Sequence, residues 1–405
     1  MHRNITRTLL IFASGAQVLT AGCSTPGRLP AVPQAASSQS IPSLGTVRFL
    51  VSRETDSFQA EAMRSLEKEQ KWLASQGQAG PMPPAYFLAV SGGGDNGAYG
   101  AGFLNGWTAS GTRPEFKVVT GISTGALIAP FAFLGPRYDN VLEKVYTTSS
   151  QKDIFKKRGI IKALFGDSMA DTRPLGTVIA SYVNRGLLDE IAAEYAKGRI
   201  LLVGTTNLDS LEPVIWNMTA IAASQDPGSI QLFRNILLAS ASIPGAFPPV
   251  MLDANIDGTH YQEMHVDGGT VAQLFLYPPS ISLANAPQRK RVAYIIRNAR
   301  LDADWASTER RTMTIAMRAI DSLTRTQGIG DLYRVYATTQ RDGVDFNLTF
   351  IPPTFTTPHN EMFDTAYMKS LYDVGLNAAK SNYQWQKFPP GFDTPLQAAS
   401  SASGK

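Results

Sequence analysis

Short apolar runs alternate with longer helical patterns through the central part of the chain. The run at 86–90 is apolar and ends in glycines, which is typical of a buried strand. The same reasoning predicts further strands at 116–120, 199–205 and 291–296, and helices at 98–109 and 124–134. This alternation predicts an α/β fold with a mostly parallel central sheet covered by helices. Ligand sites in such sheets lie at the carboxyl ends of the strands.

Two short extended runs flank Asp257 and Gly258. An Asp-Gly pair in that setting is a hairpin signal, and the second strand of this hairpin leads directly to Asp267. The same stretch also resembles the start of a calcium-binding loop. The position of the closing bidentate glutamate holds Met264, however, so the hairpin interpretation is favoured.

The N-terminus has the features of an export signal. Arg3 and Arg7 form a positive start, and the apolar stretch at 9–19 is shorter than the ~20 residues that a membrane span requires. Small residues then precede Cys23, the only cysteine in the chain. This end resembles a bacterial lipobox, with threonine where leucine is usual. The resemblance implies that residues 1–22 are a lipoprotein signal peptide and that Cys23 is lipidated. An ordinary signal peptide or an uncleaved anchor is the alternative.

Composition divides the remainder of the chain. Residues 23–45 are rich in Ser, Pro, Ala and Gln without periodicity, which predicts a flexible tether. Residues 46–395 carry the strand and helix patterns and are predicted to form one folded domain, followed by a disordered tail at 396–405. Ser24 follows the cysteine at a position where aspartate typically signals retention in the inner membrane. The expected location is therefore the bacterial cell envelope, lipid-anchored, with the outer membrane favoured.

Net charge and residue counts argue against several partners and cofactors. The formal net charge of +4 falls to +2 when Arg3 and Arg7 are removed with the signal, which is too weak to indicate nucleic-acid binding. One cysteine and four histidines exclude an intrachain disulfide and argue against a Cys- or His-rich metal site. With 43% hydrophobic residues the chain can bury a large core, and its oligomeric state stays open.

The first motif with chemical meaning is Gly121-Ile122-Ser123-Thr124-Gly125, between a predicted strand and a predicted helix. A serine on such a tight turn projects its hydroxyl clear of the backbone, and the flanking glycines leave room for a substrate. The dipole of the following helix favours negative charge developing on the serine oxygen. The motif therefore predicts a nucleophile, with a purely structural turn as the alternative.

The second motif, at 91–97, contains Gly92, Gly93 and Gly94 directly after a predicted strand. Three glycines leave backbone N–H groups accessible to the oxyanion of ester hydrolysis. The stretch also matches a dinucleotide fingerprint, which requires an acidic residue at the end of the next strand. Glu115 lies before that strand instead, so the oxyanion interpretation is favoured.

The third motif is Asp267 followed by two glycines, which alone predicts a turn or a carboxylate that leans into a site. In this order the three motifs resemble the patatin-like phospholipase family. The resemblance covers roughly 85–270 and includes 239–249, which is similar to the family's segment before the aspartate. It implies a three-layer patatin-like fold.

The family resemblance also implies an activity: a serine acyl-ester hydrolase acting on lipids, of the phospholipase A or lysophospholipase type. Ser123 would be the nucleophile and Asp267 its general base, with an oxyanion hole formed by Gly92, Gly93 and Gly94. The expected partners are a lipid or acyl-ester substrate and, through the N-terminal anchor, a membrane. A serine–aspartate dyad requires no metal or organic cofactor.

Other sequence features leave alternatives open. An α/β-hydrolase-like esterase would use Ser123, Asp267 and His359 in that order. His265 lies two residues before Asp267, hence on the same strand face, and could tune the carboxylate. Basic and apolar residues mix at 152–165, as in a lid, a surface that meets anionic lipid, or a solvated helix. A non-catalytic lipid-binding envelope lipoprotein is the alternative from another functional class.

One departure concerns the glycine loop itself. Family members commonly carry Arg or Lys inside this loop, whereas this chain has Asp95 and Asn96. An acidic residue there bears on how the loop receives an anionic head group.

Overall fold

The computed structural model describes residues 27–392 with the exception of 38–43, 45, 79, 160–165, 285, 304 and 306. The predicted signal peptide, Cys23 and the tail at 396–405 therefore lie outside the described residues. Of the predicted tether, residues 27–37 and 44 are described.

Nine of the described strands form one sheet in the order β1-β7-β6-β3-β2-β10-β11, and the β8–β9 hairpin joins it through β6. The strands are β1 Arg48–Leu50, β2 Ala85–Val90, β3 Val118–Ile122, β6 Ile200–Asn207, β7 Glu212–Asn217, β8 Val250–Ile256, β9 Thr259–Asp267, β10 Arg291–Arg297 and β11 Asp345–Phe350. From β6 through β3, β2 and β10 to β11 the strands run parallel, whereas β1, β7, β8 and β9 pair antiparallel. The prediction of an α/β fold with a mostly parallel central sheet is confirmed. A separate pair comprises β4 Lys156–Lys157 and β5 Ala170–Asp171.

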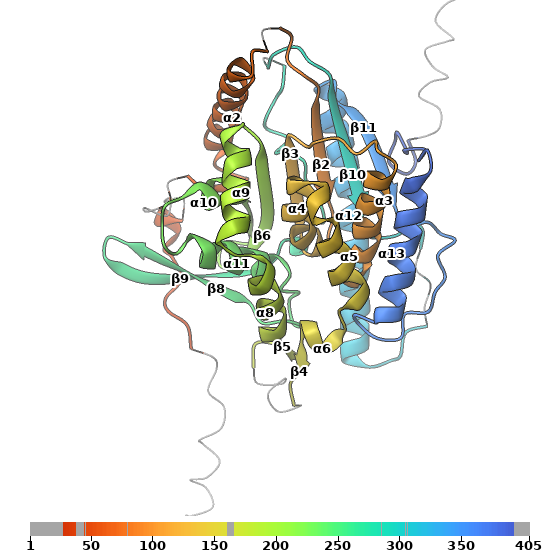
Figure 1. Ribbon diagram of the computed structural model, residues 1–405. Coiled ribbons are helices and arrows are strands. Elements are labelled where there is room, and N and C mark those ends of the chain that lie inside the picture. Colours follow the sequence, from red (N-terminus) through yellow and green to blue (C-terminus); the bar gives the residue numbers. More distant parts are fainter. Residues whose placement is uncertain are drawn as a thin grey trace, which may run out of the picture.

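Helices cover both faces of the sheet and give three layers (Figure 1). The helices are α2 Thr55–Ser75, α3 Gly97–Ala109, α4 Thr124–Leu134, α5 Asp139–Thr148, α6 Gln151–Ile154, α8 Arg173–Tyr182, α9 Arg185–Ala196, α10 Met218–Ala223, α11 Ser229–Ser240, α12 Thr312–Arg341 and α13 Thr365–Lys380. Helices α3, α4, α5, α9, α11 and α13 share the large core on one face. Helices α2 and α12 cover the other face.

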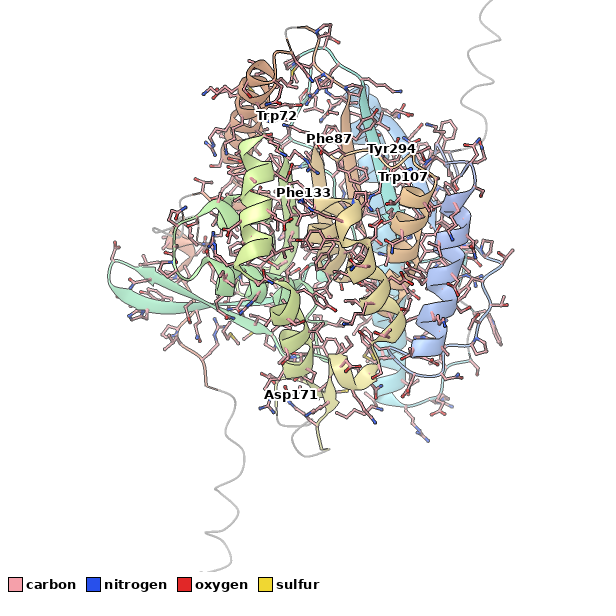
Figure 2. The ribbon with its side chains drawn as sticks, in the orientation of Figure 1. Trp72, Phe87, Trp107, Phe133, Asp171 and Tyr294 are labelled. Atoms are coloured by element: carbon pink, nitrogen blue, oxygen red, sulfur yellow. The ribbon has the colours of Figure 1, made fainter. Side chains whose placement is uncertain are left out.

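Alternate strand residues feed these two cores, as the period of a β-strand requires. Leu88 packs into the large core, whereas its neighbour Phe87 packs toward the α12 side. At the amino edge of the sheet, Trp107 of α3 meets Tyr294 of β10 edge to face, with ring centroids 4.7 Å apart (Figure 2). This aromatic packing holds α3 on the sheet and so fixes the glycine loop that precedes it.

The strands and helices expected from the sequence are present as β2, β3, β6, β10, α3 and α4, with ends displaced by at most two residues. The hairpin is also confirmed, because β8 and β9 pair up to Ile256 and Thr259. Its turn residues, Asp257 and Gly258, have φ of 51° and 81°. None of the helices within the described part of the chain has the length and apolar character needed to cross a membrane.

Candidate active site

Ser123 occupies the turn between β3 and α4, with φ 55° and ψ −126°. Such a conformation costs a residue with a side chain about 1–3 kcal/mol and persists only where the surroundings hold it. The Ser123 N–H donates to Ser240 Oγ at 3.0 Å, and that hydroxyl donates to the Gly204 carbonyl at 2.7 Å. The end of α11 thus holds the turn in its strained form.

The glycine that closes the serine motif is required by close packing. A Cβ on Gly125 would lie 2.2 Å from the Val90 carbonyl oxygen, so only glycine lets α4 begin this close to β2. The same approach brings Ser123 beside the glycine loop, where a Cβ on Gly92 would lie 3.2 Å from the Ser123 Cβ. The two sequence motifs are therefore neighbours in space.

Asp267 ends β9 and faces Ser123 across the carboxyl edge of the sheet. Ser123 Oγ donates to Asp267 Oδ2 at 2.6 Å, although 144 residues separate the two positions. The other carboxylate oxygen, Oδ1, accepts from the Gly269 N–H at 2.7 Å. Strand pairing fixes this placement, because Asp267 lies opposite Thr205 of β6. The hydroxyl of the next residue, Thr206, donates to the Asp267 carbonyl.

Burial controls the charge of this carboxylate. Both Ser123 and Asp267 are buried, at 7% and 5% exposed. Desolvation raises the pKa of Asp267 to about 7, while the hydrogen bonds from Ser123 and the Gly269 N–H act in the opposite direction. A carboxylate with a pKa near neutrality is far better matched to accept a hydroxyl proton than an ordinary aspartate.

The glycine loop is held differently at each of its three glycines. The Gly92 N–H donates to the Gln273 carbonyl at 3.0 Å, so it anchors the loop instead of facing an oxyanion. Gly93 has φ 156°, and a Cβ there would lie 2.2 Å from the Asn298 carbonyl oxygen. Within the described residues no hydrogen bond engages the N–H of Gly93 or of Gly94, and Gly94 lines the pocket beside Ser123. The geometry thus reduces the three expected donors to two.

His359 lies away from the serine–aspartate pair. Its Nε2–H donates to Asp95 Oδ2 at 2.7 Å, and the same oxygen accepts from the Phe363 N–H at 2.7 Å. Hydrogen bonding to Asp95 raises the pKa of His359. The His359 ring also stacks on Tyr367, with centroids 4.4 Å apart. The triad alternative requires His359 to bridge Ser123 and Asp267, but Ser123 donates directly to Asp267. His359 instead connects the glycine loop to the segment before α13.

His265 is fully buried, in a polar chain beside the site. The Thr205 hydroxyl donates to its Nδ1 at 3.0 Å, and its Nε2–H donates to Glu263 at 3.1 Å. Glu263 in turn pairs with Arg48 at 2.5 Å, and hydrogen bonding to His265 together with the Arg48 charge holds the pKa of Glu263 down against burial. Both ring nitrogens of His265 are thus engaged away from Asp267.

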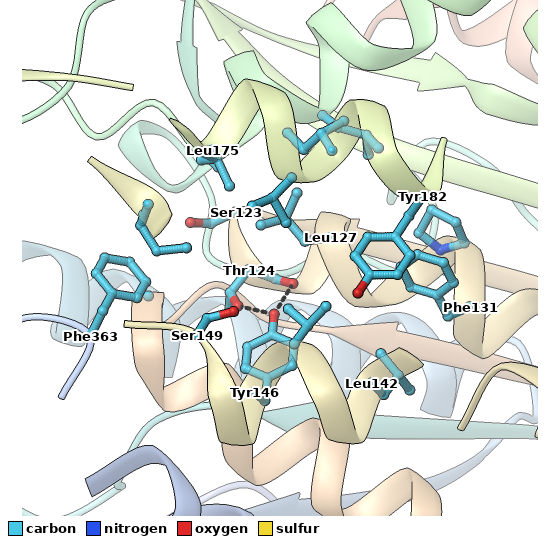
Figure 3. A pocket seen from close by; sticks show the side chains of 18 of the residues that line it. Ser123, Thr124, Leu127, Phe131, Leu142, Tyr146, Ser149, Leu175, Tyr182 and Phe363 are labelled. Atoms are coloured by element: carbon cyan, nitrogen blue, oxygen red, sulfur yellow. Dashed lines mark hydrogen bonds between the residues drawn. The ribbon is translucent and has the colours of Figure 1, made fainter. Parts of the chain in front are cut away.

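An apolar pocket runs from Ser123 along α4 (Figure 3). Figure 3 places Ser123 toward one end of it and Phe131 and Tyr182 toward the other. The pocket encloses about 930 Å³, counted out to where it opens to solvent. Its walls come from α4, α5, α8 and α11 and from the segment after α11. They include Leu127, Leu142, Val145, Tyr146, Leu175, Ile179, Leu237 and Phe247. A long aliphatic group is the ligand that such a lining accommodates.

The basic segment near residue 152 is partly described, since 160–165 lie outside the described residues. It is not one continuous helix: α6 ends at Ile154, which lines the pocket, and β4 follows. Lys152, Lys156 and Lys157 point their charges into solvent. Among the described residues no group of three His, Cys, Asp or Glu side chains is arranged to hold a metal ion.

The sequence did not reveal the residues that support the site. Gln273 receives the Gly92 N–H, and its own N–H donates to the buried Asp331 of α12 at 2.6 Å. Ser240 lies inside the stretch 239–249 that already resembled the family, so that stretch was the available signal. Asp331 and Gln273 carry no local motif, and only the fold brings them to the loop.

A buried serine–carboxylate pair at the carboxyl edge of a parallel sheet, beside an accessible glycine loop, is an arrangement that suits acyl-transfer chemistry at a strand-to-helix nucleophile turn. The family model described as patatin-like phospholipase matches residues 88–278. This stretch contains Ser123, Asp267 and the glycine loop. Over these residues the chain is similar to the patatin-like phospholipase family. Comparison with curated proteins gave no match.

Three solved structures show distant similarity to this chain. VipD from Legionella pneumophila is 13% identical, with 76% of this chain and 68% of that chain covered and a TM-score of 0.29. Human GIVD cytosolic phospholipase A2 is 10% identical, with 76% and 55% covered and a TM-score of 0.33. ExoU from Pseudomonas aeruginosa, in complex with SpcU, is 12% identical, with 76% and 55% covered and a TM-score of 0.29. The chain thus spans little more than half of the latter two.

Proposed function

We propose that this protein hydrolyses acyl esters of lipids, in the manner of a phospholipase A or lysophospholipase, with Ser123 as nucleophile and Asp267 as general base. The observation that carries the proposal is the 2.6 Å hydrogen bond from Ser123 Oγ to a buried carboxylate at the end of an apolar pocket. The pocket would hold the acyl chain, so that the ester carbonyl carbon lies beside Ser123.

The first half of the reaction forms an acyl-enzyme. Asp267 accepts the proton of Ser123 as the serine oxygen bonds to the ester carbonyl carbon. The carbonyl oxygen becomes an oxyanion, and the N–H groups of Gly93 and Gly94 donate to it. A preorganised donor of this kind stabilises the transition state by about 3–4 kcal/mol. The C–O bond to the alcohol then breaks, and Asp267 returns its proton to the departing oxygen.

The second half releases the acid. Asp267 accepts a proton from water, and the resulting hydroxide attacks the acyl carbon of the Ser123 ester. The tetrahedral intermediate again uses the two glycine N–H groups. Collapse breaks the bond to Ser123 Oγ, which regains its proton from Asp267. One carboxylate therefore serves both steps, and its raised pKa suits it to give as well as to take a proton.

Hydrolysis and active-site labelling test this function together. Purified wild-type protein should release acid from phospholipids, lysophospholipids or p-nitrophenyl esters, and a fluorophosphonate probe should label Ser123. Ser123→Ala should abolish both signals, with a rate loss of about 10³-fold or more. Ser75→Ala, at the exposed end of α2, is the matched control and should behave as wild type.

Two outcomes would contradict the proposal. The first is full activity in the Ser123→Ala protein with an unchanged thermal unfolding midpoint. The second is probe labelling at another serine in the wild type. The relative rates on the three substrate classes would also identify the preferred head group.

We also propose that the mature protein is a lipoprotein that starts at Cys23, anchored in the bacterial cell envelope, with the outer membrane favoured. The support is the sequence alone: a positive start, a short apolar stretch and a single cysteine after small residues. Within this proposal, residues 1–22 are removed and the domain at 46–395 carries the hydrolase site.

A further inference from the structure

Helix α12 is longer than the sheet that it covers. Gly328 lies against the guanidinium of Arg297, at the carboxyl end of β10. Because α12 connects the parallel strands β10 and β11, it runs back toward the amino edge from that level. The sixteen residues 312–327 therefore project beyond the carboxyl edge of the sheet, and they span about 24 Å of helix. Figure 1 shows this end of α12 at the same end of the molecule as α6 and β4.

The projecting half of α12 exposes three large apolar side chains, which define its outward face. Ile315, Ile320 and Leu323 are 52%, 43% and 71% exposed. On the other side of the helix, Met317 and Arg325 are half-buried, and Arg325 donates to the backbone carbonyls of Leu301 and of Asp302. A surface helix normally turns its large apolar side chains toward the core. This apolar face therefore requires a contact that the chain itself does not supply within the described residues.

Two further features of this edge favour a lipid bilayer as that contact. Trp305, in the connection to α12, is 89% exposed, and tryptophan prefers the interface of a membrane with water. Lys152, Lys156 and Lys157 lie at the same end of the molecule, exposed, and form no salt bridge with a described residue. Exposed lysines at the same end of the molecule as an exposed apolar helix match the charge and the apolar interior of an anionic membrane.

The proposed lipid anchor leaves the domain at the same edge. Arg28 binds Asp209 with two hydrogen bonds, of 2.7 and 2.9 Å, in the turn beyond the carboxyl end of β6. Gln262 further ties this segment down, since its N–H donates to the Pro30 carbonyl. Cys23 precedes Arg28 by five residues, which reach at most ~17 Å however they are arranged. A lipid on Cys23 would thus hold this edge, and not another, close to the bilayer.

We propose that the outward face of α12, with Trp305 and the three lysines, docks on an anionic lipid bilayer and presents the mouth of the Ser123 pocket to its substrate. The inference rests on the proposed lipid hydrolase function for its purpose, but the contact itself needs no catalysis. Ile315, Ile320 and Leu323 enter the headgroup boundary, and Lys152, Lys156 and Lys157 face the lipid phosphates.

The test measures binding to vesicles in the full chain carrying Cys23→Ser and Ser123→Ala, which removes the proposed anchor and the proposed hydrolysis. Vesicles of phosphatidylcholine with phosphatidylglycerol are compared with phosphatidylcholine alone. Leu323→Asp should weaken binding to the mixed vesicles about tenfold or more, since burying a leucine stabilises association by that order. Met63→Asp, on α2 and 51% exposed, is the matched control and should bind as the parent does.

Trp305 provides an independent readout. Its emission should shift to the blue on mixed vesicles. Trp305→Phe should remove that shift, because Trp107 and Trp216 are buried and Trp72 and Trp385 are half-buried, whereas Trp305 is exposed. Lys156→Glu with Lys157→Glu should weaken binding to the mixed vesicles and leave binding to phosphatidylcholine unchanged.

Equal binding of Leu323→Asp and Met63→Asp would overturn the proposal. So would a wild-type dimer in sedimentation that Leu323→Asp dissociates while vesicle binding stays unchanged, since a second copy would then cover α12. A catalytically inactive wild type that still shows these binding differences would overturn the hydrolase function and leave the docking surface intact.

Discussion

Asp267 is the residue on which the proposed chemistry depends most closely. Its carboxylate has two hydrogen-bond donors and, among the described residues, no cation beside it, so burial dominates and raises its pKa to about 7. A base acts only when deprotonated. Activity should therefore rise with pH through neutrality, since the ionised fraction of a group with that pKa grows about a hundredfold from pH 5 toward pH 8. An ordinary aspartate, with a pKa near 3.9, would give a flat profile over the same range.

The measurement is kcat/KM on a soluble ester between pH 5 and pH 8, which reports the pKa of the free enzyme. Asp267→Asn is the companion variant and should lose about 10³-fold or more at every pH, because its amide cannot accept the serine proton. A wild-type profile that stays level down to pH 5 would show that another group is the base.

At this scale the motifs predicted positions but not their surroundings. Ser123 and Asp267 each lie in a short glycine-containing pattern, and their chemistry can be read from residue type and order. The pKa of Asp267 depends on burial by residues that no local pattern connects to it. The prediction that the Gly92 N–H faces an oxyanion is wrong for the same reason. That N–H donates to the carbonyl of Gln273, which lies 181 residues further along the chain.

Among the elements, the glycine loop is coupled to the segment before α13 through one side chain. Asp95 Oδ2 accepts from His359 and from the Phe363 N–H, and Phe363 lines the pocket. Asp95→Ala should release the loop and lower kcat about tenfold or more, with little change in KM, because the donors at Gly93 and Gly94 lose their fixed aim. His359→Ala should lower kcat only a few-fold, since the Phe363 N–H still holds Asp95.

Steady-state kinetics on one ester, with thermal unfolding as a check of folding, decide this prediction. His359→Gln keeps an N–H donor and should restore most of what His359→Ala loses. If His359→Ala alone cost about 10³-fold, the triad interpretation would replace the dyad.

The length of α4 sets the acyl chain that the pocket accepts. Eight residues separate Ser123 from Phe131, or about 12 Å of helix. Carbon chains with bonds of about 1.5 Å at about 111° advance about 1.25 Å per carbon, so about ten carbons reach the far wall. Tyr182 packs on Phe131 there, with centroids 6.2 Å apart. Tyr182→Ala should move the preferred p-nitrophenyl ester toward longer chains.

A matched control isolates the pocket from general packing. Tyr138 also packs on Phe131, at 5.7 Å, but lies outside the pocket lining, so Tyr138→Ala should leave the chain-length preference unchanged. An equal shift in both variants would mean that the far wall is not the limit.

Elements with a clear period or a glycine boundary were predictable, and the others were not. The run at 86–90 and the helix at 124–134 are apolar throughout and bounded by turns, so β2 and α4 follow from local pattern. Helix α12 has no such signal, because its first half turns apolar residues toward solvent and its second half buries others. Its position emerges only from the β10–β11 crossover.

For the molecule as a whole, the described contacts revise the expected tether. Residues 28–30 lie on the domain, held by Asp209 and Gln262, within the stretch 23–45 that composition predicts to be flexible. Composition shows only that the segment has no periodic pattern. An extended segment that an ion pair holds on the domain also has no periodic pattern, so composition does not distinguish it from a flexible tether. These contacts hold residues 28–30 at the carboxyl edge of the sheet, where the site also lies.

Lipidation of Cys23 is the prediction that joins these parts. A single acyl chain binds membranes only marginally, so stable anchoring requires two or more chains or a second contact. Bacterial lipoproteins carry more than one acyl chain on this cysteine, and the outward face of α12 is the second contact that we propose.

Labelled palmitate should enter the wild-type protein, which should sediment with membranes after lysis. Cys23→Ser should take up no label and should bind more weakly and in a salt-sensitive way, because only the α12 face and its lysines remain. Unlabelled wild-type protein, soluble and starting downstream of residue 23, would show that the threonine in the lipobox prevents lipidation.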